Sequence, residues 1–370
     1  MEFNGINNLF GFGCMRLKMK DNEVDYEEFS SMIDSFISNG FTYFDTARVY
    51  LDGKSETALR DCLVKRYERN KFTLTDKLSR TCFEKEEDIL PFFNSQLESL
   101  GTTYLDFYLM HALNAVSYEK YKNTHAFEIC YKLKQEGKIK HLGISFHDQP
   151  EVLDKILTEQ GEKIEVVQIQ FNYLDIDNER VKSQQCYDIC VKHNKPVIVM
   201  EPIKGGTLIN LPPQADKLLR DLNNGSNASY ALRFVASHPQ VFMILSGMST
   251  KEDMIDNLNT MKNFKPFTEK EYQVIEQVRK IIKATNSIAC TKCHYCTPGC
   301  PMQIKIPEIF EIYNYDNLYH TWNIKDEYLE LIKDSSKASD CIKCGQCEGI
   351  CPQGLKIISY LESIGKKYDM

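Results

Sequence analysis

The sequence predicts an α/β protein, a (β/α)8 barrel (TIM barrel) followed by a small, mainly α-helical domain. Over the first 260 residues, short apolar segments alternate with amphipathic segments at a steady interval. Strands that alternate with helices are usually parallel, because each crossover returns the chain to the same edge. Eight such units in about 250 residues are typical of a barrel. A cluster of cysteines in the last quarter of the chain indicates the second domain.

Each short apolar segment is an expected strand, and each amphipathic segment an expected helix. The strands are Gly11–Leu17, Phe41–Thr46, Phe72–Lys77, Leu105–His111, His141–Phe146, Val166–Asn172, Pro196–Glu201 and Val241–Gly247. The helices include Tyr26–Ser38, Glu56–Arg66, Glu84–Ser99, Tyr118–Gln135, Glu179–His193, Ala228–Ser237 and Lys251–Leu258. Asn114–Thr124 and Thr207–Asn224 are expected to be loops that contribute to substrate choice.

An open, doubly wound sheet is the alternative fold. Its dinucleotide fingerprint needs three glycines, and here Gly11 and Gly13 are followed by Arg16 at the third position. A tight bend at the barrel entrance is therefore the expected role of the two glycines.

Length and charge limit the possible classes of protein. The 370 residues can hold one large and one small domain, with expected boundaries at 1–265 for the barrel, 266–285 for a connecting helix and 286–370 for the tail. The net charge of -7 is mild and no basic stretch is interleaved with aromatics, so neither nucleic acid nor an anionic membrane is an expected partner. No apolar run could span a bilayer and no export signal follows Met1, which predicts a cytoplasmic protein.

Four polar residues lie at or just beyond the carboxyl ends of expected strands. In a barrel, these strand ends meet at one mouth. The four residues are Asp45, Tyr50, Lys77 and His111. Singly, each has a structural explanation as a cap, a half-buried aromatic, a solvated strand end or a buried histidine. Together they predict an acid for carbonyl reduction: Lys77 would lower the pKa of Tyr50, Asp45 would hold Lys77, and His111 would bind the carbonyl.

At these residues the chain resembles the aldo/keto reductase family. The match covers about residues 5 to 262 and rests on F-D-T-A-x-x-Y at Phe44–Tyr50, Lys77, His111, Gly143-Ile144-Ser145, Gln170, Asn172, the run Glu201-Pro202-Ile203-Lys204-Gly205-Gly206, and Asn257. The resemblance implies a (β/α)8 barrel that reduces aldehydes and ketones with a nicotinamide cofactor. It also implies that Tyr50 is the general acid, that Lys77 and Asp45 tune it, and that His111 orients the carbonyl.

The cofactor site implied by the resemblance departs from the family pattern. Phe146 stands where most members have asparagine, so His147 is expected to substitute, and Met200 stands where an aromatic residue stacks on the nicotinamide. Asp253 stands where many members place an arginine on the 2′-phosphate, and its repulsion of that phosphate favours NADH over NADPH. Ser246–Ser249 supplies backbone amides for a phosphate. The expected cofactor contacts are Ser145, His147, Gln170, Asn172, Glu201, Ser246, Gly247, Met248 and Asn257.

Eight of the fourteen cysteines form two copies of C-x2-C-x2-C-x3-C-P. This is the ligand run of a bacterial two-cluster ferredoxin, in which the fourth cysteine of each run binds the cluster of the other. Two 4Fe-4S clusters are therefore expected. One set is Cys290, Cys293, Cys296 and Cys351, and the other is Cys341, Cys344, Cys347 and Cys300. The alternatives are a zinc site, which leaves several thiols without a role, and the c-type haem signature at Cys290–His294, which the longer run already contains.

The tail resembles that of the family branch that carries a ferredoxin-like domain. Forty residues separate Cys300 from Cys341, and Ile309–Tyr315 and Glu327–Lys333 have helical patterns, which favours an α-helical form of the domain. Lys204, after the seventh strand, could reach a phosphate or the substrate, but a loop lysine is more often solvated.

The function expected from sequence is a nicotinamide-dependent oxidoreductase acting on a small carbonyl or alcohol. A nicotinamide gives two electrons at once and each cluster takes one, so an external ferredoxin or flavoprotein partner is expected. The clusters could instead act independently of the barrel or as structural staples. The alternative function is an electron-transfer adaptor whose barrel is a docking scaffold.

Overall fold

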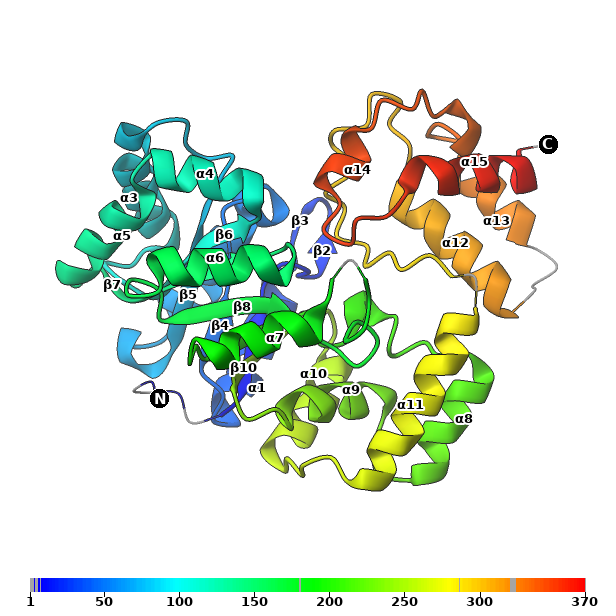
Figure 1. Ribbon diagram of the computed structural model, residues 1–370, viewed down its shortest axis with the longest axis horizontal. Coiled ribbons are helices and arrows are strands. Elements are labelled where there is room, and N and C mark those ends of the chain that lie inside the picture. Colours follow the sequence, from blue (N-terminus) through cyan, green and yellow to red (C-terminus); the bar gives the residue numbers. More distant parts are fainter. Residues whose placement is uncertain are drawn as a thin grey trace. The chain divides into compact units, whose positions relative to one another are not determined.

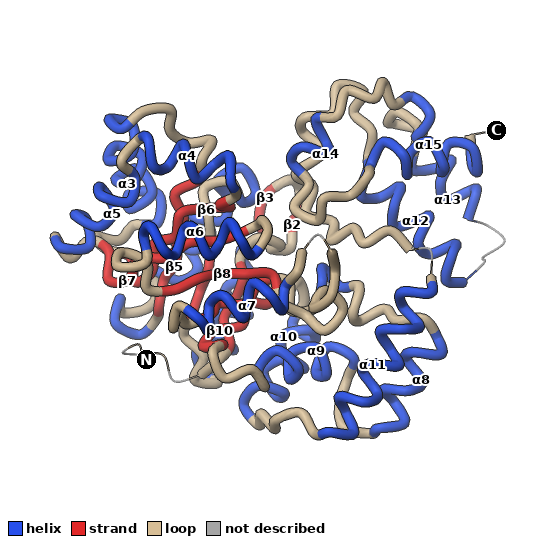
Figure 2. The backbone as a smooth tube through the Cα atoms, in the orientation of Figure 1, coloured by secondary structure: helices blue, strands red, loops and turns tan. Residues whose placement is uncertain are grey.

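The computed structural model describes residues 3, 6, 8–179, 181–285, 287–319 and 324–369. Eight parallel strands close into a barrel in the order β1-β10-β9-β8-β7-β6-β5-β4 (Figures 1 and 2). The barrel strands are β1 Phe10–Gly13, β4 Tyr43–Asp45, β5 Thr73–Ser79, β6 Leu105–Leu113, β7 Ile139–Phe146, β8 Val166–Gln170, β9 Val197–Met200 and β10 Val241–Ser246. The predicted fold class is confirmed.

The register of the strands decides which side chains share the mouth of the barrel. Asp45 at the end of β4 stands beside Thr75 of β5, and Ser79 at the end of β5 stands beside His111 of β6. Lys77 lies two residues from both Thr75 and Ser79, so all three point to the same face of the strand. The pairing thus brings Asp45, Lys77 and His111 to one end of the barrel.

Helices cover the outside of the barrel (Figure 1). They are α1 Tyr26–Ser38, α2 Lys54–Leu59, α3 Glu86–Leu100, α4 Ala115–Asn123, α5 Ala126–Gln135, α6 Pro150–Gln160, α7 Ser183–Lys192, α9 Asn227–Ala236 and α10 Lys251–Lys262. The single helix predicted over Tyr118–Gln135 is wrong, because His125 has a φ of 49° and separates α4 from α5. The sequence also missed α6 and the short hairpin of β2 Met19–Lys20 and β3 Glu23–Val24.

The predicted role of Gly11 is wrong. It lies within β1 and not at a bend, and a Cβ there would come within 2.9 Å of the side chains of Leu245, Met243 and Tyr43. The absence of a side chain makes room for the packed interior of the barrel. The strand ends at Gly13, four residues before its predicted end.

The chain divides into two compact units, Met1–Pro202 with Ala228–Phe267 and Ile203–Asn227 with Thr268–Met370. The second unit holds α8 Pro213–Leu222, α11 Glu269–Ala284, α12 Ile306–Tyr319, α13 Ile324–Leu331, α14 Gln346–Ile350 and α15 Ile357–Tyr368. Its helical character was predicted and is confirmed. The predicted loop Thr207–Asn224 is wrong, because it contains α8, which packs beside α11 (Figure 1). The predicted loop Asn114–Thr124 is also wrong, because it contains α4. Within the described ranges, no helix is long and apolar enough to cross a membrane.

Candidate active site and cysteine sets

A buried ion pair stands at the mouth of the barrel. The Lys77 Nζ donates to Asp45 Oδ1 at 2.6 Å and to the Thr46 carbonyl at 2.7 Å. The side chains of Lys77 and Asp45 are 0% and 4% exposed. Burial raises the pKa of Asp45, while Lys77 and a hydrogen bond from Gln168 oppose that shift. Two buried charges are tolerated here because they compensate each other and are hydrogen-bonded.

Tyr50 and His111 lie beside this pair. Tyr50 opens a short 3-10 helix, Tyr50–Gly53, after β4. The Lys77 Nζ is 4.8 Å from the centre of the Tyr50 ring. The centres of the Tyr50 and His111 rings are 5.9 Å apart, and the angle between the two ring planes is 82°. The structure therefore brings together all four side chains that the sequence singled out.

The pKa of Tyr50 shifts opposite to the predicted direction. Burial raises it well above the usual value of 10, and the charges of Asp45 and Asp76 add to the increase. The charge of Arg16 opposes this increase. Tyr50 is thus held as a protonated phenol, which is the form that can donate a proton.

His111 is held as a neutral imidazole. Burial lowers its pKa well below 6.5, and the charges of Lys77 and His147 lower it further. The Ser79 Oγ lies 2.7 Å from His111 Nδ1. With Nδ1 paired to the hydroxyl of Ser79, Nε2 is the ring nitrogen that can meet a substrate.

Three of the predicted cofactor residues come from the ends of β7 and β8. Ser145 is 1% exposed, and its Oγ has no hydrogen-bond partner among the described residues. Burial lowers the pKa of His147 to about 4, and a hydrogen bond with Gln170 opposes the shift. These side chains give the mouth a set of neutral polar groups that could bind an amide.

Asn172 and Glu201, also predicted cofactor residues, take part in loop structure. The Asn172 Nδ2 donates to Asp175 Oδ2 at 2.9 Å and to the Glu201 carbonyl at 3.1 Å. Its Oδ1 accepts from the backbone N–H groups of Leu174 and Asp175, each at 3.0 Å. Glu201 has a φ of 57°, which ends β9 one residue before the predicted end, and its Oε1 accepts from Arg16 Nη2 at 3.3 Å. The cofactor contacts predicted for both residues stay predictions.

The remaining predicted contacts lie where β10 leads into α10. The Asn257 Nδ2 donates to Ser246 Oγ at 3.4 Å, and both side chains are buried. Gly247 is exposed while Met248 is buried. Thr250 caps the helix by accepting from the Asp253 N–H. The N-terminus of a helix favours an anion, but Asp253 itself adds a negative charge there.

Two supporting side chains and one backbone carbonyl were missed from the sequence. The carbonyl of Thr46 accepts from Lys77, Gln168 donates to Asp45 Oδ2 at 3.4 Å, and Ser79 pairs with His111. Two of them could have been found, because side chains two residues apart on a strand point to the same face. Gln168 precedes Gln170 by two residues, and Ser79 follows Lys77 by two.

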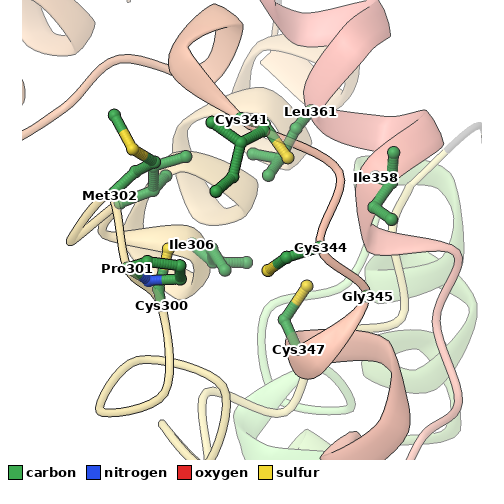
Figure 3. Close-up of a pocket in the computed structure, with 12 residues that line it drawn as sticks. Cys300, Pro301, Met302, Ile306, Cys341, Cys344, Gly345, Cys347, Ile358 and Leu361 are labelled. Atoms are coloured by element: carbon green, nitrogen blue, oxygen red, sulfur yellow. The ribbon is translucent and has the colours of Figure 1, made fainter.

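One predicted cysteine set surrounds a cavity in the second unit (Figure 3). The cavity is lined by Cys300, Cys341, Cys344 and Cys347, so the last cysteine of the first run joins three from the second run. The rest of its lining is mostly aliphatic, with Met302, Ile304, Ile306, Ile342, Ile358 and Leu361 among it. An apolar cavity with four thiols suits a 4Fe-4S cluster, whose potential depends on solvent access.

The other predicted set is also drawn from both runs. Burial raises the pKa of Cys290 to about 12, and the neighbouring thiols of Cys293 and Cys351 add to the increase. The same causes raise the pKa of Cys296 to about 12, with Cys293, Cys290 and Cys351 as its thiol neighbours. Cys351 therefore lies near Cys290 and Cys296, which are distant from it in sequence.

Within the described part of the chain, no three His, Cys, Asp or Glu side chains converge closely enough to hold one metal ion. Each thiolate of a four-iron cluster binds a different iron atom, so the ligands of a cluster stand further apart than those of a single ion.

Comparison with known proteins supports both parts of the chain. Residues 10–280 match the model of the aldo/keto reductase family, and residues 289–355 match that of the 4Fe-4S dicluster domain. An uncharacterized oxidoreductase of Bacillus subtilis is 24% identical over 310 residues, which cover 75% of this chain and 95% of the relative. Glyoxal reductase of the same organism is 25% identical over 62% of this chain and 75% of its own length.

Solved structures show the same barrel. An aldo-keto reductase from Klebsiella pneumoniae in complex with NADPH aligns with a TM-score of 0.60 at 21% identity, over 73% of this chain and 90% of that one. An aldo-keto reductase from Bacillus halodurans aligns with a TM-score of 0.60 at 25% identity, over 73% and 91%.

Paired cysteine substitutions test the ligand sets. We expect wild-type protein purified without oxygen to carry about eight iron atoms and eight sulfides per chain. Cys293→Ser/Cys351→Ser should keep about half of both, because its two changes fall in one set. Cys344→Ser/Cys351→Ser should lose nearly all, because its changes fall in different sets. The measurement is iron and sulfide content with the absorption spectrum, and reversed results for the two variants would show that each run binds its own cluster.

Proposed function

The chain belongs to the aldo/keto reductase family, and on that premise we propose that its barrel reduces the carbonyl group of a small molecule, or oxidises the corresponding alcohol. The observation that carries the proposal is the convergence of Asp45, Tyr50, Lys77 and His111. The Lys77 Nζ lies 2.6 Å from Asp45 and 4.8 Å from the centre of the Tyr50 ring. A proton donor, a buried cation and a neutral imidazole at one mouth are the groups that carbonyl reduction requires.

Each side chain has a separate task in this proposal. His111 Nε2–H donates to the carbonyl oxygen and orients it. Tyr50 transfers its phenolic proton to that oxygen as negative charge develops there. The ammonium of Lys77, held by Asp45, stabilises the phenolate that remains. A bound nicotinamide would supply the hydride.

The groups around Ser145 fit a nicotinamide. Its buried Oγ lacks a partner among the described residues, and a buried hydroxyl normally has one. Ser145, His147 and Gln170 would bind the carboxamide, and the backbone of Ser246–Met248 would bind the pyrophosphate. We propose NADH rather than NADPH, because Glu252 and Asp253 both lie exposed in the first turn of α10.

The tail is proposed to hold two 4Fe-4S clusters on the two cysteine sets. Such clusters transfer one electron at a time, so we propose that they exchange electrons with a ferredoxin or a flavoprotein. No disulfide joins any of the fourteen cysteines, which suits the reducing cytoplasm proposed as the location.

An electron-transfer adaptor is the second candidate, and the departures from the family pattern at Phe146, Met200 and Asp253 favour it. The two functions differ in their response to NADH and to a carbonyl. An adaptor would be reduced and reoxidised by a protein partner without turnover of any small molecule. Bleaching of the clusters by NADH alone would instead show that electrons enter from the nicotinamide without a partner.

Removal of the proposed acid tests the enzyme. Tyr50→Phe should lower kcat/KM for carbonyl reduction by about 10²- to 10⁴-fold, because a positioned general acid contributes on that scale. The matched control is Tyr43→Phe, which removes a hydroxyl from a buried tyrosine of β4, the strand that precedes Tyr50. The control should retain near-normal turnover, and both variants should keep the circular dichroism spectrum of the wild type. Equal activity in Tyr50→Phe and the wild type would show that another group is the acid.

The pH profile tests the state of Tyr50. The active form is the protonated phenol, which is present below its pKa and lost as pH rises through it. Because burial raises this pKa well above 10, kcat/KM for reduction should stay level from about pH 7 to 10 and fall only at higher pH. The profile is measured over that range with saturating cofactor and limiting substrate. A fall centred near pH 8 would mean that Lys77 controls the phenol after all.

Cofactor choice tests the role of Asp253. NADH should bind more tightly than NADPH in fluorescence titrations, and Asp253→Arg should tighten NADPH binding by about tenfold, as expected when one repulsive charge becomes attractive near the protein surface. Asp188→Arg, in an exposed position of α7, controls for the change in net charge. Tighter binding of NADPH by the wild type would contradict the proposed preference.

A further inference from the structure

The loop that follows β9 carries a lysine whose burial the sequence did not predict. Lys204 is 1% exposed although it opens a short 3-10 turn, Lys204–Gly206. Its φ of 47° lies in the left-handed region. Such a conformation is unfavourable for a non-glycine residue and persists only where the surroundings fix it. Strained residues of this kind concentrate at functional sites, so the contacts of Lys204 call for an explanation.

Gln353 is one of those contacts. The Lys204 Nζ donates to Gln353 Oε1 at 3.2 Å, and Gln353 is 6% exposed. The Gly354 N–H donates to the Cys351 carbonyl at 2.9 Å. Gln353 therefore lies in a tight turn whose first residue, Cys351, is a proposed cluster ligand. The amide oxygen faces the lysine, while the amide nitrogen, Nε2, has no acceptor among the described residues.

Gly205 brings the same loop against the other chain segment that contributes to this cysteine set. A Cβ at this position would lie 2.5 Å from the carbonyl oxygen of Thr291, and the φ of Gly205 is +60°. Thr291 is 2% exposed and directly follows Cys290. The loop therefore touches both chain segments that supply Cys290, Cys293, Cys296 and Cys351.

We propose that Gln353 donates an N–H···S hydrogen bond to the cluster expected on this set, that Lys204 orients and polarises the amide, and that this cluster consequently has the higher reduction potential of the two. The inference rests on the cysteine sets of the proposed function. A buried amide N–H requires an acceptor, and the sulfurs of a cluster are acceptors whose hydrogen bonds set its potential. Reduction adds one negative charge to the cluster, and a buried cation nearby favours the reduced form.

Potentiometric titration followed by electron paramagnetic resonance tests this inference. In Lys204→Met and in Gln353→Leu, the reduction equilibrium constant of one cluster should fall by roughly threefold to tenfold. For a one-electron couple that is a shift of about 30 to 60 mV to more negative potential. The other cluster should be unchanged. The variant Cys344→Ser/Cys347→Ser should lack the other cluster. Its remaining resonance signal therefore identifies which cluster changes potential.

Lys292→Met is the matched control, because it removes a lysine from between Cys290 and Cys293. The side chain of Lys292 is 43% exposed and pairs with Glu311, so solvent screens its charge and the shift should be less than half that of Lys204→Met. Equal shifts in these two variants, or unchanged potentials with all iron retained, would overturn the inference.

A second measurement covers the case in which Gln353→Leu loses iron. Pulsed resonance of the reduced wild type, labelled with ¹⁵N in the glutamine side chains, should show a nitrogen coupling that Lys204→Met weakens. Absence of any such coupling would refute the hydrogen bond. Wild-type protein that lacks eight irons would instead refute the cluster assignment itself, so the two failures can be told apart.

Discussion

The buried ion pair of Lys77 and Asp45 is the interaction on which the mouth of the barrel depends. Removing one partner of such a pair typically costs about 3–5 kcal/mol, because the other charge stays buried without compensation. The pair is satisfied only if β4, β5 and β8 hold their register, since Asp45, Lys77 and Gln168 each come from a different strand. The closed barrel therefore sets the geometry of the site, and the site in turn constrains the strands.

A second buried group of charges lies on the opposite face of β5. Asp76 follows the alternation of the strand and points away from Lys77. Glu56 accepts from Arg48 at 2.7 Å, and Gln96 donates to the Lys77 carbonyl at 3.1 Å. Burial and the charge of Glu56 raise the pKa of Asp76 well above its usual value. This arrangement ties α2 and α3 to β5 and fixes the position from which Lys77 reaches the mouth.

The sequence was informative where function depends on strand ends and on ligand spacing. Asp45, Lys77 and His111 could be placed together because parallel strands end at one mouth, and the two cysteine runs have a spacing with few other uses. Reasoning from the sequence failed where the property of a side chain depends on the residues that surround it in the fold. The direction of the Tyr50 pKa shift follows from burial and from the charges of Asp45 and Asp76, which spacing does not encode. Lys204 and α8 were missed because their partners, Gln353 and α11, are distant in sequence.

The connection between β9 and α9 links the proposed clusters to the barrel through the chain itself. Ile203–Asn227 is compact with Thr268–Met370, although its ends are covalently joined to elements of the other unit. Gly205 meets Thr291 so closely that any side chain is excluded. The conformation of this loop is thus set by the segment that begins the first cysteine run. Because Thr291 directly follows Cys290, the loop that follows β9 is fixed against the residue next to the first proposed cluster ligand.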